Sequence, residues 1–443
     1  MLRGNGLLHG NHVMTYTDAV SYLYSLQKHG IRLGLDTMAA LMERLDMPQV
    51  RYPSFHIAGT NGKGSTAALT AAILQACGYR VGLYTSPHLV EFRERIRVNG
   101  RMVEESDIAR LTDRIKTLSE PELSPTFFEF TTAMALQYFA DSTVDVAVLE
   151  VGLGGRFDAT NVVSPLACAI TTIALDHQEY LGTTLESVAF EKAGIIKRSV
   201  PAILGRLPDS ARDTIERIAF ERHAPILCLG RDFHVDGETP ARFRYWSADV
   251  RYDGLTCPLL GAHQVDNCTS AIALVEAARP QLAVAEPAIR AGLREVQWEG
   301  RLEVVAENPL TILDGAHNPS AAEALAGYLR RFRREHPSSR VILVLGMMRD
   351  KDHRGYVGPF TGLVDAVVLT QAELKRSATA DELQTVIGGV LPQVRIHPRV
   401  SDALGAAREL ARSHDVICVT GSLMLIGEVK ALLRGSGVSP LRG

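Results

Sequence analysis

Short apolar runs alternate with alanine- and leucine-rich stretches along most of the chain, and this alternation limits the possible folds more than any other feature. Stretches such as TAALTAAILQACG and EFTTAMALQYFAD are typical of helices. Continuous apolar strands separated by helices predict a parallel sheet that is covered by helices on both faces. The predicted strands of this first series lie in SFHIAG, RVGLYTS, VDVAVLEV, ACAITTIA and VPAIL.

The regular alternation breaks between residues 232 and 258, where turn residues and short alternating runs predict a small antiparallel insertion. A helix is expected next, from about Asp266 to Ala278, followed by a second strand–helix series in LTILDG, RVILVLG, DAVVLT, QVRIH and DVICVTG. We therefore predict an α/β protein with two domains. Residues 1–298 would form a P-loop-type domain with a mostly parallel sheet and the insertion, and residues 299–443 a smaller Rossmann-like domain.

Composition and charge restrict the partners and the compartment. The formal net charge of -3 argues against DNA or RNA as the main partner, and no apolar stretch approaches the roughly 18 residues that span a bilayer. The six cysteines are scattered without a CxxC pair, which favours reduced, mostly buried thiols and a cytoplasmic setting. Residues 1–14 lack the apolar centre of a signal peptide and are expected to be a flexible lead-in, and a translation start at Met14 is a hypothesis.

Residues 59–66, GTNGKGST, lie between a predicted strand and a predicted helix, which is the context of a phosphate-binding loop. Glycines let backbone N–H groups turn toward a ligand, the helix N-terminus adds partial positive charge, and Lys63 can neutralise phosphate oxygens. The usual G-x-x-x-x-G-K-[ST] pattern nevertheless fails, because it requires glycine at Ile57 and serine or threonine at Gly64. By itself the loop supports a nucleotide site and a glycine turn with a solvent-exposed lysine about equally.

Polar side chains also follow the next three predicted strands. Ser86 follows the second strand, Glu150 ends the third, and Asp176 and His177 follow the fourth. Because ligands in open α/β sheets bind at the carboxyl ends of the strands, we expect these side chains to lie together. A buried carboxylate such as Glu150 needs a cation or an ion pair, and Mg²⁺ prefers few carboxylates combined with phosphate oxygens. The pattern favours a magnesium–nucleotide site, with an ion-paired strand end as the alternative.

A helix is predicted over LESVAFEKAGIIK, directly after the fourth strand. Thr183 and Glu186 are expected to form its capping box. Apolar neighbours on this helix indicate that Lys192 is partly buried, although a surface lysine is the simpler alternative.

The second domain offers another strand–turn–helix in LTILDGAHNPSAAEALAGYL. Asn318 and Pro319 suit the N-cap and the first helical position. Asp314 and His317 then lie on the strand-to-helix turn, which is a common place for ligand contacts. Arg301, at the predicted domain junction, could reach a phosphate bound in the first domain.

Taken together, these segments resemble the Mur ligase superfamily and, more narrowly, the dihydrofolate synthase/folylpolyglutamate synthase family. The matching motifs occur in family order from about residue 31 to residue 352, with TGSLMLIGE as a C-terminal echo. Other Mur ligases have threonine or serine directly after the loop lysine, and the intervening Gly64 is typical of the folate branch. The matching segments are IRLGLD, GTNGKGS, YTSPHL, RIRVNG, FFEFTTAMAL, LEVGLGGRFDATN, ITTIALDHQEYLGTT, FEKAGIIK, GAHQVDN, WEGRLE, LDGAHNP and GMMRDKD.

The resemblance implies a role for each matching position. The ATP contacts it implies are Asn61, Gly62, Lys63, Gly64, Ser65, Asn267, Arg301 and Asp314. The ligands it implies for two Mg²⁺ ions are Ser65, Ser86, Glu150 and His177. The residues it implies in catalysis are Lys63, His177, Lys192 and His317. The residues it implies for the pterin-bearing substrate are Leu33, Gly34, Leu35, Asp36, Phe127, Phe128, Phe157, Asp158 and Ala159.

The resemblance has particular consequences at Lys192, Phe157 and Arg376. Lys192 corresponds to a lysine that is carbamylated in the family, a modification that turns a cation into a carboxylate. Phe157 stands where the family often has leucine, which could alter the packing of the pterin. The segment LKRSAT blurs the family's proline–arginine–alanine motif, so the resemblance gives a contact by Arg376 weaker support.

The reaction that the resemblance implies is ATP-dependent addition of L-glutamate to dihydropteroate and to the γ-carboxylate of reduced folates, through an acyl phosphate. The implied partners are small molecules only, bound by a cytoplasmic monomer. A monofunctional synthase is the alternative within the family, and IRLGLD and FFEF favour the bifunctional form, because both lie where dihydropteroate is expected. A switch protein that hydrolyses ATP without ligation is the alternative from another class. Against it, Glu150, His177 and Lys192 form a fuller metal site than a switch needs.

Overall fold

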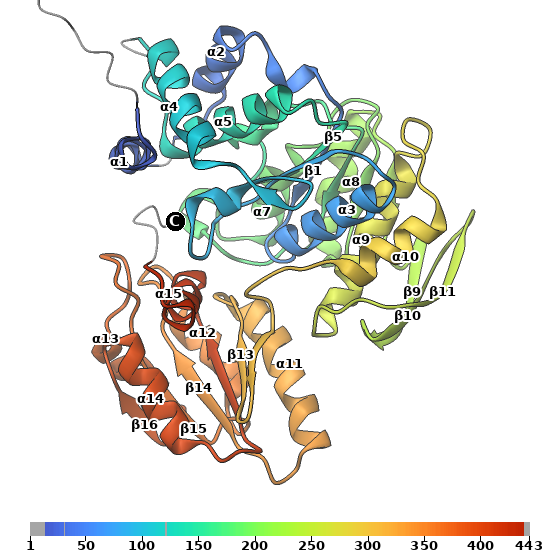
Figure 1. Cartoon of the computed structure of the whole chain (residues 1–443). Helices are drawn as coiled ribbons and strands as arrows, with labels where there is room; N and C mark the ends of the chain where they lie inside the picture. Colours follow the sequence, from blue (N-terminus) through green and yellow to red (C-terminus); the bar gives the residue numbers. More distant parts are fainter. Residues whose placement is uncertain (1–13, 31, 120–121, 438–443) are drawn as a thin grey trace, which may run out of the picture.

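The computed structural model describes residues 14–30, 32–119 and 122–437, and this part of the chain forms two α/β units, each built around its own sheet (Figure 1). The predicted flexible lead-in lies, except for Met14, outside the described residues. The sheets fall on either side of residue 298, and the predicted boundary itself stays a prediction. None of the described helices has the length and apolarity needed to cross a membrane.

Eight strands form the larger sheet, in chain order β1 (Ser54–Ala58), β2 (Val81–Tyr84), β3 (Ile96–Val98), β4 (Arg101–Met102), β5 (Val146–Glu150), β6 (Ala167–Ile170), β7 (Ala202–Leu204) and β8 (Ile226–Cys228). Their order in space is β4-β3-β2-β5-β1-β6-β7-β8. All pairs from β2 across to β8 are parallel, and the pairs β2–β3 and β3–β4 are antiparallel. The carboxyl ends of β2, β5, β1 and β6 therefore meet at one edge.

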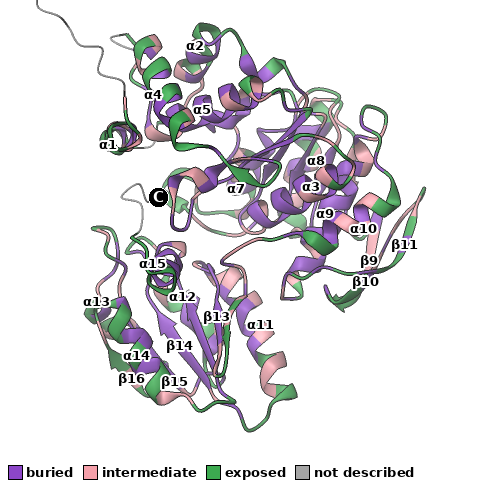
Figure 2. Cartoon of the chain, viewed as in Figure 1, coloured by how far each residue is buried: buried purple, intermediate pink, exposed green. Residues whose placement is uncertain are grey.

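Helices cover both faces of this sheet. They are α1 (Tyr16–Leu26), α2 (Asp36–Arg44), α3 (Lys63–Ala76), α4 (Glu105–Ser119), α5 (Phe127–Asp141), α6 (Gln178–Leu181), α7 (Leu185–Ala193), α8 (Asp209–Glu221), α9 (His263–Ala277) and α10 (Glu286–Glu295), with 3-10 helices at Gln27–His29, Pro48–Val50, Phe92–Arg95 and Ala159–Val162. Successive side chains of a strand point to opposite faces. Val146 and Val148 of β5 join a cluster with α3, α9 and α10, whereas Ala147 and Leu149 pack with α1, α2, α4 and α5. The strands are accordingly buried between two helical layers (Figure 2).

The predicted insertion is a separate antiparallel sheet of β9 (Phe233–Thr239), β10 (Arg242–Ser247) and β11 (Arg251–Leu255). It extends from the larger unit beside α10 (Figure 1). Its buried aromatic side chains, among them Phe243 and Tyr245, join the same cluster as α9. The insertion therefore extends an existing core.

The second unit has six strands, β12 (Glu303–Glu307), β13 (Leu310–Leu313), β14 (Val341–Leu345), β15 (Ala366–Leu369), β16 (Val394–Ile396) and β17 (Val416–Thr420), in the order β12-β13-β17-β14-β15-β16. Its helices are α11 (Pro319–Glu335), α12 (His353–Val357), α13 (Ala380–Ile387), α14 (Val400–Leu410) and α15 (Leu423–Arg434), with a 3-10 helix at Gly358–Phe360. Val341 and Leu343 pack with α11 to α13, whereas Ile342 and Val344 pack with α14 and α15. Only the β12–β13 pair is antiparallel.

The predicted fold class is confirmed, with differences at its margins. The strands β3, β4, β8 and β12 were not predicted. All four lie at or next to a sheet edge; β3, β4 and β8 have only two or three residues, and β12 is largely exposed. The predicted capping box is wrong by one residue. Thr184, not Thr183, is the N-cap of α7, and its hydroxyl accepts the N–H of Ser187 at 3.2 Å. Helix α9 likewise begins one turn earlier than predicted, at His263.

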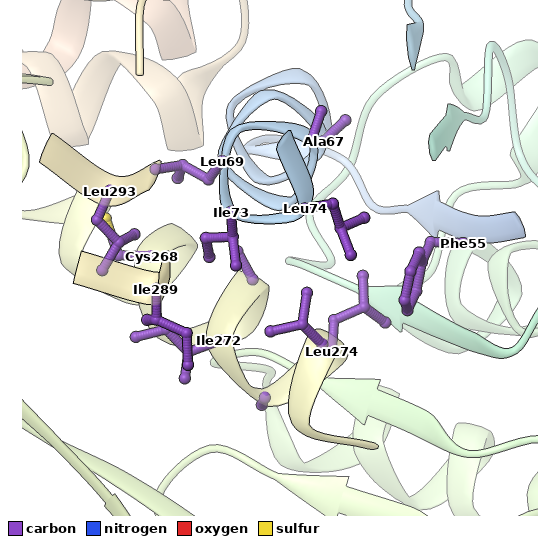
Figure 3. Close-up of a cluster of buried hydrophobic side chains, with 14 of the residues drawn as sticks. Phe55, Ala67, Leu69, Ile73, Leu74, Cys268, Ile272, Leu274, Ile289 and Leu293 are labelled. Atoms are coloured by element: carbon purple, nitrogen blue, oxygen red, sulfur yellow. The ribbon is translucent and has the colours of Figure 1, made fainter. Parts of the chain in front are cut away.

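Helices α3 and α10 approach closely in the core of the larger unit. Ile73 of α3 shares a buried cluster with Ile289 and Leu293 of α10 (Figure 3). A Cβ atom on Gly292 would lie 2.4 Å from the Cα atom of Ile73. The missing side chain thus allows the two backbones to touch.

Replacing Gly292 with alanine is expected to lower the free energy of unfolding by about 2 kcal/mol, because α10 must move away from α3. Urea denaturation would measure this loss. Gly327→Ala is the matched control, since nothing lies within 4 Å of a Cβ atom there, and alanine should stabilise α11 by up to about 1 kcal/mol. Equal effects of the two substitutions would contradict the close approach.

Candidate active site

A cavity of about 620 Å³ opens along the carboxyl ends of β1, β2, β5 and β6 and reaches into the second unit. Of the predicted site residues, only Leu35 and Asp36 do not line it, since Asp36 begins α2 on the exposed surface. The predicted residues that line it are Leu33, Gly34, Asn61, Gly62, Lys63, Gly64, Ser65, Ser86, Phe127, Phe128, Glu150, Phe157, Asp158, Ala159, His177, Lys192, Asn267, Arg301, Asp314 and His317. The two units therefore share one site.

The segment GTNGKGST connects β1 to α3 in the manner of a phosphate loop. Gly62 is the N-cap of α3 with a left-handed φ of 85°, and a Cβ atom there would lie 2.4 Å from Oδ1 of Asn267. Lys63 folds back, and its Nζ donates to the carbonyls of Gly59 and Thr60, each at 3.0 Å. The first turn of α3, whose N–H groups have no partners within the helix, lines the cavity.

The structure gives a physical reason for the glycine at position 64. A Cβ atom on Gly64 would lie 3.0 Å from Cζ2 of Trp298 and 3.4 Å from Oε2 of Glu150. Trp298 belongs to the WEGRLE segment at the junction of the units, and it fills the space that a side chain after Lys63 would need. The hydroxyl of this helical turn comes instead from Ser65, which lies 3.4 Å from Nε2 of Gln264.

Lys63 and Lys192 share the carbonyl of Gly59. Lys192, on α7, is 4% exposed, and its Nζ donates to this carbonyl at 2.8 Å. Burial, with the neighbouring charge of Lys63, lowers the pKa of Lys192 to about 7. Burial also lowers the pKa of Lys63. A large fraction of Lys192 is therefore neutral near pH 7, and the neutral amine is the form that reacts with carbon dioxide.

Glu150 ends β5 as a buried carboxylate, 5% exposed. Its Oε2 accepts the N–H of Ser86 at 3.0 Å. Burial raises the pKa of Glu150, and the charges of Lys63 and Arg301 oppose this shift. Among the described residues, none forms an ion pair with Glu150, which disfavours the ion-paired strand end.

A magnesium ion would fit beside Glu150 only with help from a ligand. Within residues 14–30, 32–119 and 122–437, no group of three or more His, Cys, Asp or Glu side chains is placed to hold a metal. Mg²⁺ suits such a donor-poor site, because it commonly combines one or two carboxylates with phosphate oxygens and water. The hydroxyl groups of Ser65 and Ser86 are further oxygen donors on residues that line the cavity.

His177 begins α6 as its N-cap, with a left-handed φ of 49°. Its Nε2 lies 4.0 Å from Oδ1 of Asp176. Although its side chain is 41% exposed, desolvation within the cavity and the charge of Lys351 lower the pKa of His177 to about 4, which favours the neutral imidazole at pH 7. Neutral imidazole is the form that binds metals.

Asp176 joins the two units. Its carboxylate accepts hydrogen bonds from Nζ of Lys351 at 2.6 Å and from Nδ2 of Asn318 at 3.0 Å. Asn318, the predicted N-cap of α11, also exchanges hydrogen bonds of 3.0 and 3.2 Å with Asn61 of the phosphate loop. Although burial acts to raise it, contacts with His317 and Lys351 hold the pKa of Asp176 well below its usual range. An ionised carboxylate therefore bridges the units.

The turn after β13 is held by its own side chains. The Asp314 carboxylate accepts two backbone N–H groups, at 2.9 and 3.0 Å. Nδ1 of His317 donates to the carbonyl of Gly315 at 2.8 Å. Arg301 donates to the preceding carbonyl at 2.9 Å and otherwise faces the cavity.

Aromatic side chains line the end of the cavity formed by the first unit. Phe127 and Phe128 begin α5, and Phe157 follows β5. The guanidinium carbon of Arg156 lies 4.2 Å from the ring centroid of Phe157, and Arg156 pairs with Glu191 at 2.6 Å. Phe157, the departure from the family pattern, is thus held in place by a cation.

Asp158 stabilises the loop that carries Phe157. Its carboxylate accepts the N–H groups of Leu153 at 2.8 Å and Thr160 at 3.0 Å. Burial raises the pKa of Asp158, and these bonds oppose the shift. The carboxylate therefore shapes the aromatic end of the cavity through its own loop.

Among the cavity residues to which the sequence assigned no role, Arg95 and Lys351 carry charge at the site. Both lie in segments that match the family, RIRVNG and GMMRDKD, so the only available signal was the motif itself. The partner of Lys351 is 175 residues away, and nothing in the sequence indicates that pairing.

Known proteins with the same organisation match the chain along nearly its whole length. The Mur ligase middle domain matches residues 57–275, and the Mur ligase glutamate ligase domain matches residues 300–423. The dihydrofolate synthase/folylpolyglutamate synthase of Bacillus subtilis (strain 168) is 34% identical over 431 residues, covering 95% of this chain and 99% of that protein.

Two solved structures are also similar to this chain over nearly its whole length. E. coli FolC in complex with DHPP and ADP has a TM-score of 0.88 at 36% identity, covering 95% of this chain and 98% of that one. The bifunctional folylpolyglutamate synthase/dihydrofolate synthase of Yersinia pestis, complexed with AMPPNP and Mn ion, has a TM-score of 0.86 at 35% identity, with the same two coverages, 95% and 98%.

Replacing Lys351 with methionine is expected to weaken the closure of the two units, because Asp176 keeps its charge and loses its cationic partner. Breaking a buried ion pair from one side costs on the order of 3 kcal/mol. X-ray scattering in the presence of a non-hydrolysable ATP analogue should give a larger radius of gyration than for the wild type. Lys375→Met, at an exposed lysine of the second unit, is the control. An unchanged radius for Lys351→Met would argue against the bridge.

Proposed function

The chain belongs to the dihydrofolate synthase/folylpolyglutamate synthase family of Mur ligases, and from this membership we propose its function. It is an ATP-dependent amide ligase that adds L-glutamate to dihydropteroate and to the γ-carboxylate of reduced folates. The observation that carries the proposal is the shared cavity. In it, a phosphate loop and a buried carboxylate of the first unit meet the Asp314–His317 turn of the second.

The first step activates a carboxylate, which is by itself a poor acyl donor. A carboxylate oxygen of the substrate attacks the γ-phosphorus of ATP, and the bond from this phosphorus to the bridging oxygen of ADP breaks. The products are an acyl phosphate and ADP. Lys63 and the N–H groups of the first turn of α3 offset the charge on the transferred phosphoryl group.

The second step forms the amide. The neutral amino group of L-glutamate attacks the carbonyl carbon of the acyl phosphate, and the resulting tetrahedral intermediate loses a proton from nitrogen and expels inorganic phosphate. Water would hydrolyse the acyl phosphate, so the cavity must be closed during this step. The contacts of Asp176 with Lys351 and Asn318 supply that closure.

Binding roles for the cavity residues complete the proposal. Ser65, Ser86, Glu150 and His177 would hold two Mg²⁺ ions, which would neutralise phosphate charge. The manganese ion of the Yersinia pestis structure supports a divalent metal. The residues proposed to contact ATP are Asn61, Gly62, Lys63, Gly64, Ser65, Asn267, Arg301 and Asp314. The residues proposed to contact the pterin-bearing substrate are Leu33, Gly34, Phe127, Phe128, Phe157, Asp158 and Ala159, with Leu35 and Asp36 at the rim.

The setting proposed is a cytoplasmic monomer. All six cysteines are free, and five of them are buried, which supports a reducing compartment. Both units of a single chain line the cavity, which supports a site that is complete without a second copy.

A phosphate-release assay tests the function. We expect release from ATP to require both L-glutamate and either dihydropteroate or tetrahydrofolate. Release with tetrahydrofolate alone as acceptor would reduce the function to folylpolyglutamate synthesis. Release that needs neither substrate would point to an ATP-hydrolysing switch instead.

Lys192 is proposed to be carbamylated. Because its pKa is about 7, the neutral fraction of the amine rises as the pH increases through 7, and carbamate should form above that pH and disappear below it. NMR with ¹³C-labelled bicarbonate would detect the carbamate carbon. Lys192→Ala should abolish this signal and lower ligation by about 100-fold, a loss typical of removing a group that orients a metal site.

Lys197→Ala is the control for that measurement. Lys197 follows the same helix, and its Nζ donates to the carbonyl of Asn161, away from the cavity. Its substitution should leave the carbamate signal in place. A signal that survives in Lys192→Ala would remove the proposed modification.

A further inference from the structure

Arg95 is a buried cation of the cavity to which the reaction above gives no role. It ends the 3-10 helix Phe92–Arg95, directly before β3, and is 2% exposed. Its Nε donates to Nδ1 of His88 at 2.8 Å, and its guanidinium carbon lies 5.3 Å from the ring centroid of Phe127. One edge and one face of the guanidinium are thus fixed, and the side chain lines the cavity.

The two terminal nitrogens of Arg95 have no hydrogen-bond partner in the part of the chain that the structure describes. The charges of Glu150 and Glu94 act on Arg95 from a distance, but neither carboxylate forms an ion pair with it. Glu94 accepts three backbone N–H groups of its own turn, at 2.8 to 3.0 Å, and Glu150 accepts the N–H of Ser86. A guanidinium stays protonated even when buried, and a buried charge without a counter-ion is costly. The cavity is therefore built to receive an anion at this point.

The position of Arg95 indicates which anion would bind to it. The N–H of Thr85 donates to the carbonyl of Arg95 at 3.0 Å, so Arg95 lies next to Ser86 at the phosphate end of the cavity. The Phe127 ring marks the beginning of the aromatic end. The aromatic part of the substrate would lie against the phenylalanines, and its carboxylate must reach the γ-phosphate of ATP. That carboxylate therefore has to lie between the aromatic end and the phosphate end of the cavity.

We propose that Arg95 binds the substrate carboxylate that ATP activates, through both terminal nitrogens. This inference rests on the proposed function. The planar guanidinium fork matches the two oxygens of a carboxylate. When one oxygen becomes the bridge to phosphorus, the other remains as the carbonyl oxygen of the acyl phosphate and keeps its bond to Arg95. Negative charge develops on that oxygen when the amine attacks, so the same contact stabilises the tetrahedral intermediate.

The test compares two ligands that differ only in charge. Calorimetry in the presence of ADP would measure binding of dihydropteroate and of its carboxamide analogue. The wild type should prefer the carboxylate by about thirtyfold or more, because removing one partner of a buried charged hydrogen bond has an effect of this size. Arg95→Met should bind both ligands with nearly equal affinity, and Arg95→Lys should regain part of the preference.

Arg101→Met is the matched control. Arg101 lies on the neighbouring strand β4, is exposed, and does not line the cavity. This variant should keep the full preference for the carboxylate. Affinity for ADP should be unchanged in all the variants, which would show that the fold and the phosphate loop are intact.

Two outcomes would overturn the inference. If Arg95 had a merely structural role, Arg95→Met would bind both ligands more weakly by the same factor and would keep the preference for the carboxylate. Loss of ADP binding in both Arg95→Met and Arg95→Lys would likewise assign Arg95 to the framework. If the wild type bound neither dihydropteroate nor tetrahydrofolate, the proposed function itself would fail, and the inference with it.

Discussion

The carbonyl oxygen of Gly59 is the acceptor on which the site depends, because it receives hydrogen bonds from the side-chain nitrogens of both Lys63 and Lys192. Gly59 has a φ of 148°, and a Cβ atom there would lie 1.9 Å from Oγ1 of Thr171. Only glycine therefore lets the chain leave β1 this close to the segment after β6. Sharing one acceptor holds the two lysines together, and burial together with the neighbouring charge of Lys63 lowers the pKa of Lys192.

An ion pair connects this edge of the sheet to the second unit. Asp176 lies at the same sheet edge as the lysines, yet its partners are Lys351 and Asn318 of the second unit. Asn318 in turn bonds to Asn61 within the phosphate loop. Of these bridging side chains, Asp176, Lys351 and Asn61 also line the cavity, so the contacts between the units lie at the site itself.

The sequence allowed the central strands and the sheet-edge residues to be predicted, since buried parallel strands must be continuously apolar and must end together. Edge strands such as β12 could not be predicted, because an exposed strand has no continuous apolar run. The capping box was misplaced by one residue, since Thr183 and Thr184 both suit an N-cap and only the backbone decides between them. Lys351 and Arg95 could not be assigned roles, because their meaning depends on which groups lie nearby in space.

The loop that departs from the usual phosphate pattern is explained by packing. Gly64 leaves room for Trp298, whose ring lies against the loop and 6.0 Å from the guanidinium carbon of Arg97. Trp298 stands directly before the junction from which the second unit extends. A serine or threonine after Lys63 would push this ring away from the loop. The glycine thus preserves a direct contact between the loop after β1 and the segment that joins the two units.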